Sequence, residues 1–201
     1  MNTGTLKKEF YTQSDTVMIA RALLGKTLHT HFDRRHTSGI ICETEAYCGT
    51  ADRGCHAYNG RLTDRTRIMY AEGGVSYVYL CYGIHNLFNV VTHTAGEPHA
   101  VLIRAIAPQE GTDTMLQRRG IAKANPQMAA GPGLVAQCLG LTTKHSGLSL
   151  LGDRIWISDA PAIAETDIIA SARVGMNFTG PYHNIPWRFR IKGSPHTSKA
   201  R

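Results

Sequence analysis

GIICETEAY, at residues Gly39–Tyr47, is the stretch around which the rest of the chain is organised. Its Ile, Cys and Thr residues predict a β-strand, whose side chains alternate between two faces. One face would carry Ile40, Cys42, Thr44 and Ala46, and the other Ile41, Glu43, Glu45 and Tyr47. Acids are uncommon in strands and costly to bury. The acidic face is therefore either the ordinary solvent-facing surface of an antiparallel sheet or a general base beside an aromatic wall.

Length and charge bound what the whole chain can be. With 201 residues we expect one domain, covering residues 1–201. The net charge is +7 and the basic residues are clustered, chiefly at 53–67, 118–123 and 188–201. Clustered Lys and Arg suit a polyanion, because they displace condensed counterions from a phosphate backbone.

The sequence gives no indication of a membrane or secretory protein. The first ten residues lack an apolar segment behind their lysines, and no apolar run approaches the length of a transmembrane helix. The five cysteines form no tight framework, which favours a reducing compartment. We therefore expect a soluble, cytoplasmic protein.

The remaining pattern predicts more strands than helices. Expected strands cover 26–32, 75–82, 87–91, 100–107, 154–157 and 187–191, and expected helices cover 14–24, 112–119 (capped by Thr112) and 134–139. Residues 33–38 are expected to form a polar turn, 49–68 a long loop, and 83–86 the turn of a hairpin. Without the strand–helix rhythm of a parallel sheet, the pattern favours an α+β fold with an antiparallel or mixed sheet.

Four tyrosines are candidates for contact with nucleobases. Tyr47 lies on the acidic strand, and Tyr77, Tyr79 and Tyr82 lie along the hairpin. Flat rings near a basic surface stack on bases, but Tyr also packs well in any sheet. Tyr82 adjoins the turn at Gly83, where its own sheet buries it poorly and where it could act as a wedge.

A metal site is the alternative for the segment that contains His56. Cys42, Cys48, Cys55 and His56 are close in sequence. Their spacings match no zinc pattern of closely paired cysteines, so we expect no metal.

Many short motifs, in order along nearly the whole chain, resemble one family. They are Glu43–Tyr47, His56, Arg61–Thr63, Met69, Tyr77–Tyr79, Tyr82-Gly83, Asn89, Val101–Ala105, Glu110-Gly111, Gly131–Gly133, Ala172–Gly175, Pro186–Phe189 and Lys192–Pro195. Together they resemble the alkyladenine (3-methyladenine) DNA glycosylases of bacterial type. The resemblance implies a single α+β domain with a curved, open-barrel-like sheet, flanking helices and a protruding β-hairpin.

The resemblance also implies roles for individual residues. Glu45 matches the general base that activates a water, and Arg104 matches the residue that helps to hold this water. The base pocket would be formed by Tyr47, His56, Tyr79 and Asn89, with Asn89 discriminating against normal guanine. Tyr82 matches the side chain that enters the minor groove and fills the gap left by the flipped nucleotide.

The implied reaction is DNA repair by base excision. A monomer would flip an alkylated or deaminated purine out of duplex DNA and hydrolyse its N-glycosidic bond without a cofactor, in the cytoplasm and associated with the nucleoid. No lysine stands at the matched catalytic positions, so no lyase activity is expected. One departure is Leu134, where many members carry Lys.

Two other classes of protein remain as alternatives. A non-catalytic nucleic-acid-binding module on a similar open β-barrel would explain the charge and the tyrosines, but not the set Glu45, His56 and Arg104. A metal-dependent hydrolase would need a ligand set that the cysteine and histidine spacing hardly supports.

Overall fold

The centre of the fold is strand β2 (Arg35–Cys48), seen in a computed structural model that describes residues 4–199. Strands β1 (Thr27–Phe32) and β8 (Arg188–Ile191) pair with successive parts of one edge of β2, and β5 (His99–Pro108) pairs with the other edge. All three pairings are antiparallel. The stretch Gly39–Tyr47 is thus the middle of the sheet, as its composition predicts.

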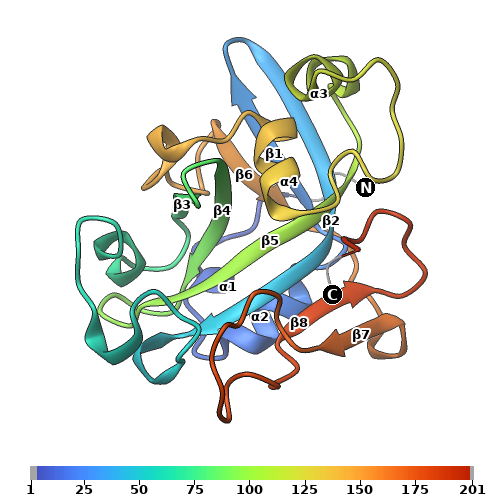
Figure 1. Ribbon diagram of the computed structural model, residues 1–201. Coiled ribbons are helices and arrows are strands. Elements are labelled where there is room, and N and C mark those ends of the chain that lie inside the picture. The colour runs from blue at the N-terminus through green and yellow to red at the C-terminus, as the bar shows by residue number, and fades with distance from the viewer. Residues whose placement is uncertain (1–3, 200–201) are drawn as a thin grey trace.

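Four further strands complete an eight-stranded sheet that is not closed (Figure 1). The order β3-β4-β5-β2-β1-β6 forms its main path, and β8 carries β7 on its outer edge. Their bounds are β3 Ser76–Cys81, β4 His85–Thr92, β6 Ile155–Ser158 and β7 Ile168–Ser171. The single domain and its α+β class are as predicted.

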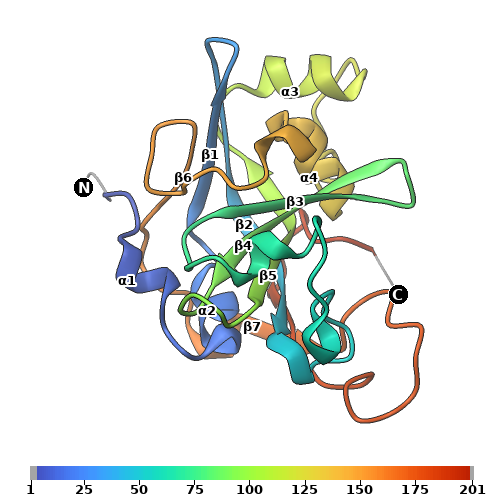
Figure 2. The ribbon, with the colours of Figure 1, turned by 90° about the vertical axis from the view of Figure 1, so that its left-hand side faces the viewer.

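Four α-helices cover the sheet from two sides: α1 (Lys8–Tyr11), α2 (Thr16–Ala22), α3 (Thr112–Arg119) and α4 (Pro132–Leu139). Helix α2 packs on β2 and β5, and α4 packs on β4 and β5 from the opposite face (Figure 2). The core between these layers is fully buried, as at Leu23 and Ile103. Short 3-10 turns at Gly49–Ala51, Tyr58–Gly60 and Arg67–Tyr70 interrupt the long loop after β2.

Two local predictions are wrong. The turn expected at 33–38 contains only Asp33 and Arg34, both with positive φ, because β1 and β2 form a tight hairpin whose register pairs Phe32 with Arg35. Helix α3 is capped by Gly111 rather than Thr112. Gly111 has φ 71°, and a Cβ there would lie 2.2 Å from the carbonyl oxygen of His36, so only glycine fits.

The β3–β4 hairpin extends away from the body of the sheet, as the resemblance implies (Figure 2). Its turn consists of Tyr82, Gly83 and Ile84, and Tyr82 and Gly83 both have positive φ. Within residues 4–199, no helix is long and apolar enough to cross a membrane.

Candidate active site

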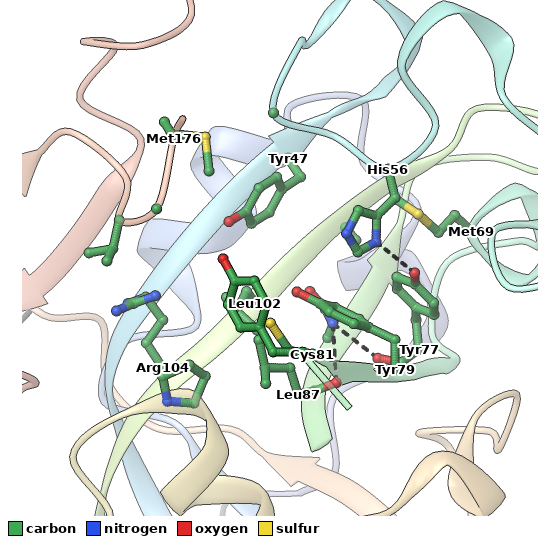
Figure 3. A pocket seen from close by; sticks show the side chains of 17 residues that line it. Tyr47, His56, Met69, Tyr77, Tyr79, Cys81, Leu87, Leu102, Arg104 and Met176 are labelled. Atoms are coloured by element: carbon green, nitrogen blue, oxygen red, sulfur yellow. Dashed lines mark hydrogen bonds between the residues drawn. The ribbon is translucent and has the colours of Figure 1, made fainter. Parts of the chain in front are cut away.

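A cavity of about 450 Å³ opens between the β3–β4 hairpin, β5 and the loops that follow β2 and β7 (Figure 3). Six of the seven candidate site residues line it: Tyr47, His56, Tyr79, Tyr82, Asn89 and Arg104. Tyr77, Met69, Leu102 and Met176 complete much of the wall. The structure therefore gathers residues that are up to 129 positions apart in the sequence around one volume of the size of a small-molecule site.

Among the described residues, five aromatic rings line the cavity, those of Tyr47, His56, Tyr77, Tyr79 and Tyr82. The rings of His56 and Tyr79 meet edge to face, with 4.5 Å between their centroids. The hydroxyl of Tyr77 lies 2.8 Å from Nδ1 of His56 (Figure 3). Burial, together with the nearby charges of Arg65 and Arg61, lowers the pKa of His56 to about 4. His56 is therefore neutral near pH 7, so one of its ring nitrogens carries a proton and the other is an acceptor.

Asn89 lies on β4, lines the cavity and is buried. Its amide nitrogen donates to the carbonyl oxygen of Tyr77 at 3.1 Å. This bond fixes the orientation of the amide group, so the acceptor oxygen is the polar atom that Asn89 offers to a ligand.

Glu45 is fully buried, at 0% exposure, directly behind the cavity wall. Its Oε2 accepts from the Tyr47 hydroxyl and its Oε1 from the backbone N–H of Val174, each at 2.8 Å. Nη1 of Arg104 lies 3.4 Å from Oε1. All three neighbours line the cavity. Burial raises the pKa of Glu45, although the Arg104 charge and the two hydrogen bonds oppose this effect.

Glu43 has a different environment, two residues earlier on β2. Its Oε1 accepts from Nε of Arg104 at 2.8 Å, from Nε of Arg188 at 2.7 Å and from the hydroxyl of Ser198 at 2.9 Å. Its Oε2 accepts from the backbone N–H of Ser198 at 2.7 Å. Burial alone would raise its pKa, but the charge and hydrogen bond of Arg104, with the Ser198 N–H and the Arg188 charge, lower it. Glu43 thus remains ionised and orients Arg104 toward Glu45.

The interpretation of the acidic face as a solvent-facing surface is wrong, because Glu43 and Glu45 are both fully buried. The simple alternation of side chains is also interrupted. The register with β5 shifts on both sides of Glu43, so Cys42 lies in an irregularity of the strand. A bulge of this kind commonly redirects a side chain near a functional site.

Tyr82 is 84% exposed at the tip of the hairpin, and its neighbour Ile84 is 72% exposed. The expectation that the sheet buries Tyr82 poorly is confirmed. The tip of this two-stranded arm thus exposes two large side chains, of which Tyr82 also lines the cavity.

The cysteines do not form a metal centre in the described part of the chain. Cys42, Cys48, Cys55, Cys81 and Cys138 are free thiols. Within residues 4–199, no three His, Cys, Asp or Glu side chains converge as metal ligands would.

The sequence alone missed the contacts of three residues that hold the site together. Asp52 and Arg173 form a fully buried ion pair, with 2.6 Å between Oδ2 and Nη1. Arg173 belongs to a quoted motif and Asp52 to the long loop, but the 121 positions between them leave no local signal of their contact. Ser198 was also missed, since nothing nearby in sequence indicates its hydrogen bonds to Glu43.

Comparisons with known proteins agree with this architecture. The profile of the methylpurine-DNA glycosylase family matches residues 9–195. A relative from Chlamydia felis is 48% identical over 187 residues, which cover 92% of this chain and 95% of the relative. A Chlorobaculum tepidum relative is 42% identical, covering 98% and 91%, and a Bacillus cereus relative is 40% identical, covering 94% and 97%.

All three relatives carry the provisional name 3-methyladenine DNA glycosylase. The family match and these identities extend over the strands, loops and hairpin that build the cavity. The chain with the buried Glu45 and its aromatic pocket thus belongs to the methylpurine-DNA glycosylase family.

Proposed function

We propose that this protein is a monofunctional DNA glycosylase, acting as one domain, that flips a damaged purine out of duplex DNA and hydrolyses its N-glycosidic bond. The observation that carries the proposal is the buried Glu45 carboxylate, whose three hydrogen-bond and charge partners all line an aromatic cavity. An enzyme that acts on a base must take it out of the stack into such a pocket.

The chemistry follows from the positions of Glu45 and Arg104. Glu45 accepts a proton from a water that attacks C1′ of the sugar, while the bond from C1′ to the purine nitrogen breaks and the base leaves with the bonding electrons. The water would lie beside the Glu45 carboxylate, whose Oε2 keeps its hydrogen bond from the Tyr47 hydroxyl. Arg104 favours the ionised form of Glu45 and lies against the cavity, where the water would sit.

Water rather than an amine is the nucleophile in this proposal. No lysine lines the cavity among the described residues. A Schiff-base mechanism with strand cleavage requires an amine at the sugar carbon. The product is therefore an abasic site in an uncut strand.

The walls favour damaged purines over normal ones. Alkylation at a ring nitrogen gives the base a positive charge, which the faces of Tyr47 and Tyr79 attract. Neutral His56 offers an N–H donor to lesions that are not charged. Asn89 would clash with the amino group of normal guanine. We propose 3-methyladenine as the main substrate, with 7-methylguanine, hypoxanthine and etheno-adenine as further ones.

The hairpin would lower the free-energy cost of extruding the base. Unstacking costs a few kcal/mol, and side chains inserted between base steps offset part of this cost. Tyr82 is exposed at the tip of the arm beside the cavity and would enter the minor groove. The net charge of +7 favours duplex DNA. The protein would act as a monomer on nucleoid DNA in the cytoplasm.

The test is base release from duplex oligonucleotides that carry one hypoxanthine or one etheno-adenine, and from methylated DNA, all in EDTA. Wild type should release bases and Glu45→Gln should bind the same DNA without releasing them. Glu165→Gln is the matched control, because Glu165 is exposed on the surface. If pure, folded wild type releases no base from any substrate, the better account is a non-catalytic nucleic-acid-binding module.

A further inference from the structure

The Asp52–Arg173 ion pair lies immediately behind the aromatic wall, and we infer that Arg173 is a positioning residue for Glu45 and Tyr47. This inference rests on the proposed glycosylase function. Arg173 does not line the cavity. It contacts the ring of Tyr47 and precedes Val174 in the chain, and both of these residues line the cavity. It therefore acts on the reaction through its neighbours.

The anchor of this arrangement is Asp52, at the start of the loop that carries His56. Its carboxylate accepts from the backbone N–H groups of Cys48 and Gly54, at 3.0 and 2.9 Å. It also accepts from both terminal nitrogens of Arg173, at 2.6 and 2.7 Å. Both side chains of the pair are 0% exposed. A paired, two-point contact of this kind fixes the plane of the guanidinium as well as its position.

The guanidinium lies over the ring of Tyr47. Its central carbon lies 4.7 Å from the centre of the Tyr47 ring and 5.2 Å from that of Trp187. Nη1 also donates to the carbonyl oxygen of Ala46 at 2.9 Å. The ring and the backbone of the end of β2 are thus both held by one side chain.

The same residue fixes a donor to Glu45. Val174 follows Arg173 directly and donates its backbone N–H to Glu45 Oε1 at 2.8 Å. Met176 continues the segment along the cavity, and a Cβ at Gly54 would lie only 2.7 Å from its sulfur and 2.8 Å from Nη2 of Arg173. The pair therefore joins three parts of the wall: the end of β2, the loop to His56, and the segment Val174–Met176.

A role in geometry rather than in stability alone follows from the energetics of buried ion pairs. Desolvation of both charges offsets most of their attraction, so an intact pair contributes little net stability compared with apolar residues. A displacement of about 1 Å in a catalytic group, by contrast, can reduce a rate about a hundredfold. The main consequence of this pair is the fixed position of the groups around Glu45.

The test uses two variants that perturb the pair in different ways. Asp52→Asn with Arg173→Gln removes both charges together, so that no unpaired charge is left buried. Gly54→Ala keeps both charges but forces its new Cβ against Arg173 and Met176. The control is Lys26→Met with Asp159→Asn, which removes an ion pair of 2.5 Å that is distant from the cavity lining.

Folding of each variant is checked by circular dichroism, and the single-turnover rate of base release is then measured with excess enzyme against pH. Both test variants should lose at least about tenfold in this rate, while binding of lesion DNA changes by less than about threefold. The acid limb of the profile should also move to higher pH, because the Val174 N–H no longer stabilises ionised Glu45. The control should keep the wild-type limb.

A folded variant with the wild-type rate and acid limb overturns the inference. Should the double variant fail to fold, Gly54→Ala decides by the same two readings. Should neither variant fold, the pair is required for the fold itself and the inference of a positioning role is rejected. Wild type that releases no base is a different result, since it rejects the proposed function before any variant is compared.

Discussion

His56 should make the protein less stable in acid, by an amount that follows from its burial. Its pKa falls from the ordinary 6.5 to about 4 in the folded protein, because burial and two arginines disfavour the charged ring. Above pH 6.5 the ring is neutral in both states, so it contributes no pH dependence. Between pH 6.5 and 4 the unfolded chain binds a proton that the folded chain does not, so stability falls as the pH falls.

The size of this effect follows from the difference between the pKa of His56 in the unfolded and in the folded chain. Each unit of pH within it costs about 1.4 kcal/mol, so wild type loses about 3 kcal/mol from this residue by pH 4. His56→Gln lacks the titrating ring but also weakens the bond to Tyr77, which costs about 1 kcal/mol at pH 7. Wild type should therefore be the more stable protein at pH 7 and the less stable one near pH 4.

Urea unfolding followed by fluorescence at pH 7, 5.5 and 4.5 measures both proteins under matched conditions. The difference between them cancels the contributions of His29, His99 and His145, whose pKa values are also lowered by burial. A stability difference that stays constant over this pH range would refute the reasoning and place His56 in contact with solvent or with a charge that the structure does not show.

Three further predictions concern base release. Tyr82→Ser should reduce base flipping about tenfold, and most at undamaged pairs, because the side chain that would fill the gap in the base stack is lost. The measurement is the fluorescence of a base analogue beside the site, and equal flipping by the variant and wild type would contradict the proposed role of Tyr82. Asn89→Ala should begin to release normal guanine from undamaged duplex, as detected by chromatography of free bases, while Ile169→Ala, at an exposed apolar site, should not. Base release should decrease as the pH falls through the raised pKa of Glu45. Tyr47→Phe loses a donor to the carboxylate, so the acid limb of its pH profile should lie at higher pH than in wild type. An unmoved acid limb would show that the hydroxyl does not bond to ionised Glu45.

Much of the fold could be predicted from local patterns. The aromatic and β-branched run before Gly83 gives the hairpin, because strand propensity and turn chemistry agree there. The polar composition of residues 33–38 predicted a longer turn than the structure has. Polar residues such as Arg35 also occur in the strands of a hairpin, where the short turn sets the pairing. Helix α1 and strand β7, each four residues long, are too short to give a periodic signal.

The candidate site could be predicted only in part. A period-two pattern shows that Glu43 and Glu45 share a face, but it does not show whether water or protein covers that face. Residue roles came from the resemblance rather than from spacing. The contacts of Asp52 with Arg173 and of Glu43 with Ser198 join distant parts of the chain, so they depend on tertiary packing that no local motif records.

The bonds from Arg188 and Ser198 to Glu43 have a consequence for biosynthesis. Ser198 follows Glu43 by 155 positions, so a growing chain exposes its acids long before their late partners leave the ribosome. Until then Glu43 lacks the hydrogen bonds from Arg188 and Ser198 that keep its carboxylate ionised and fixed in position beside Arg104. The full set of bonds that orients this arginine is thus complete only after Arg188 and Ser198 have been synthesised.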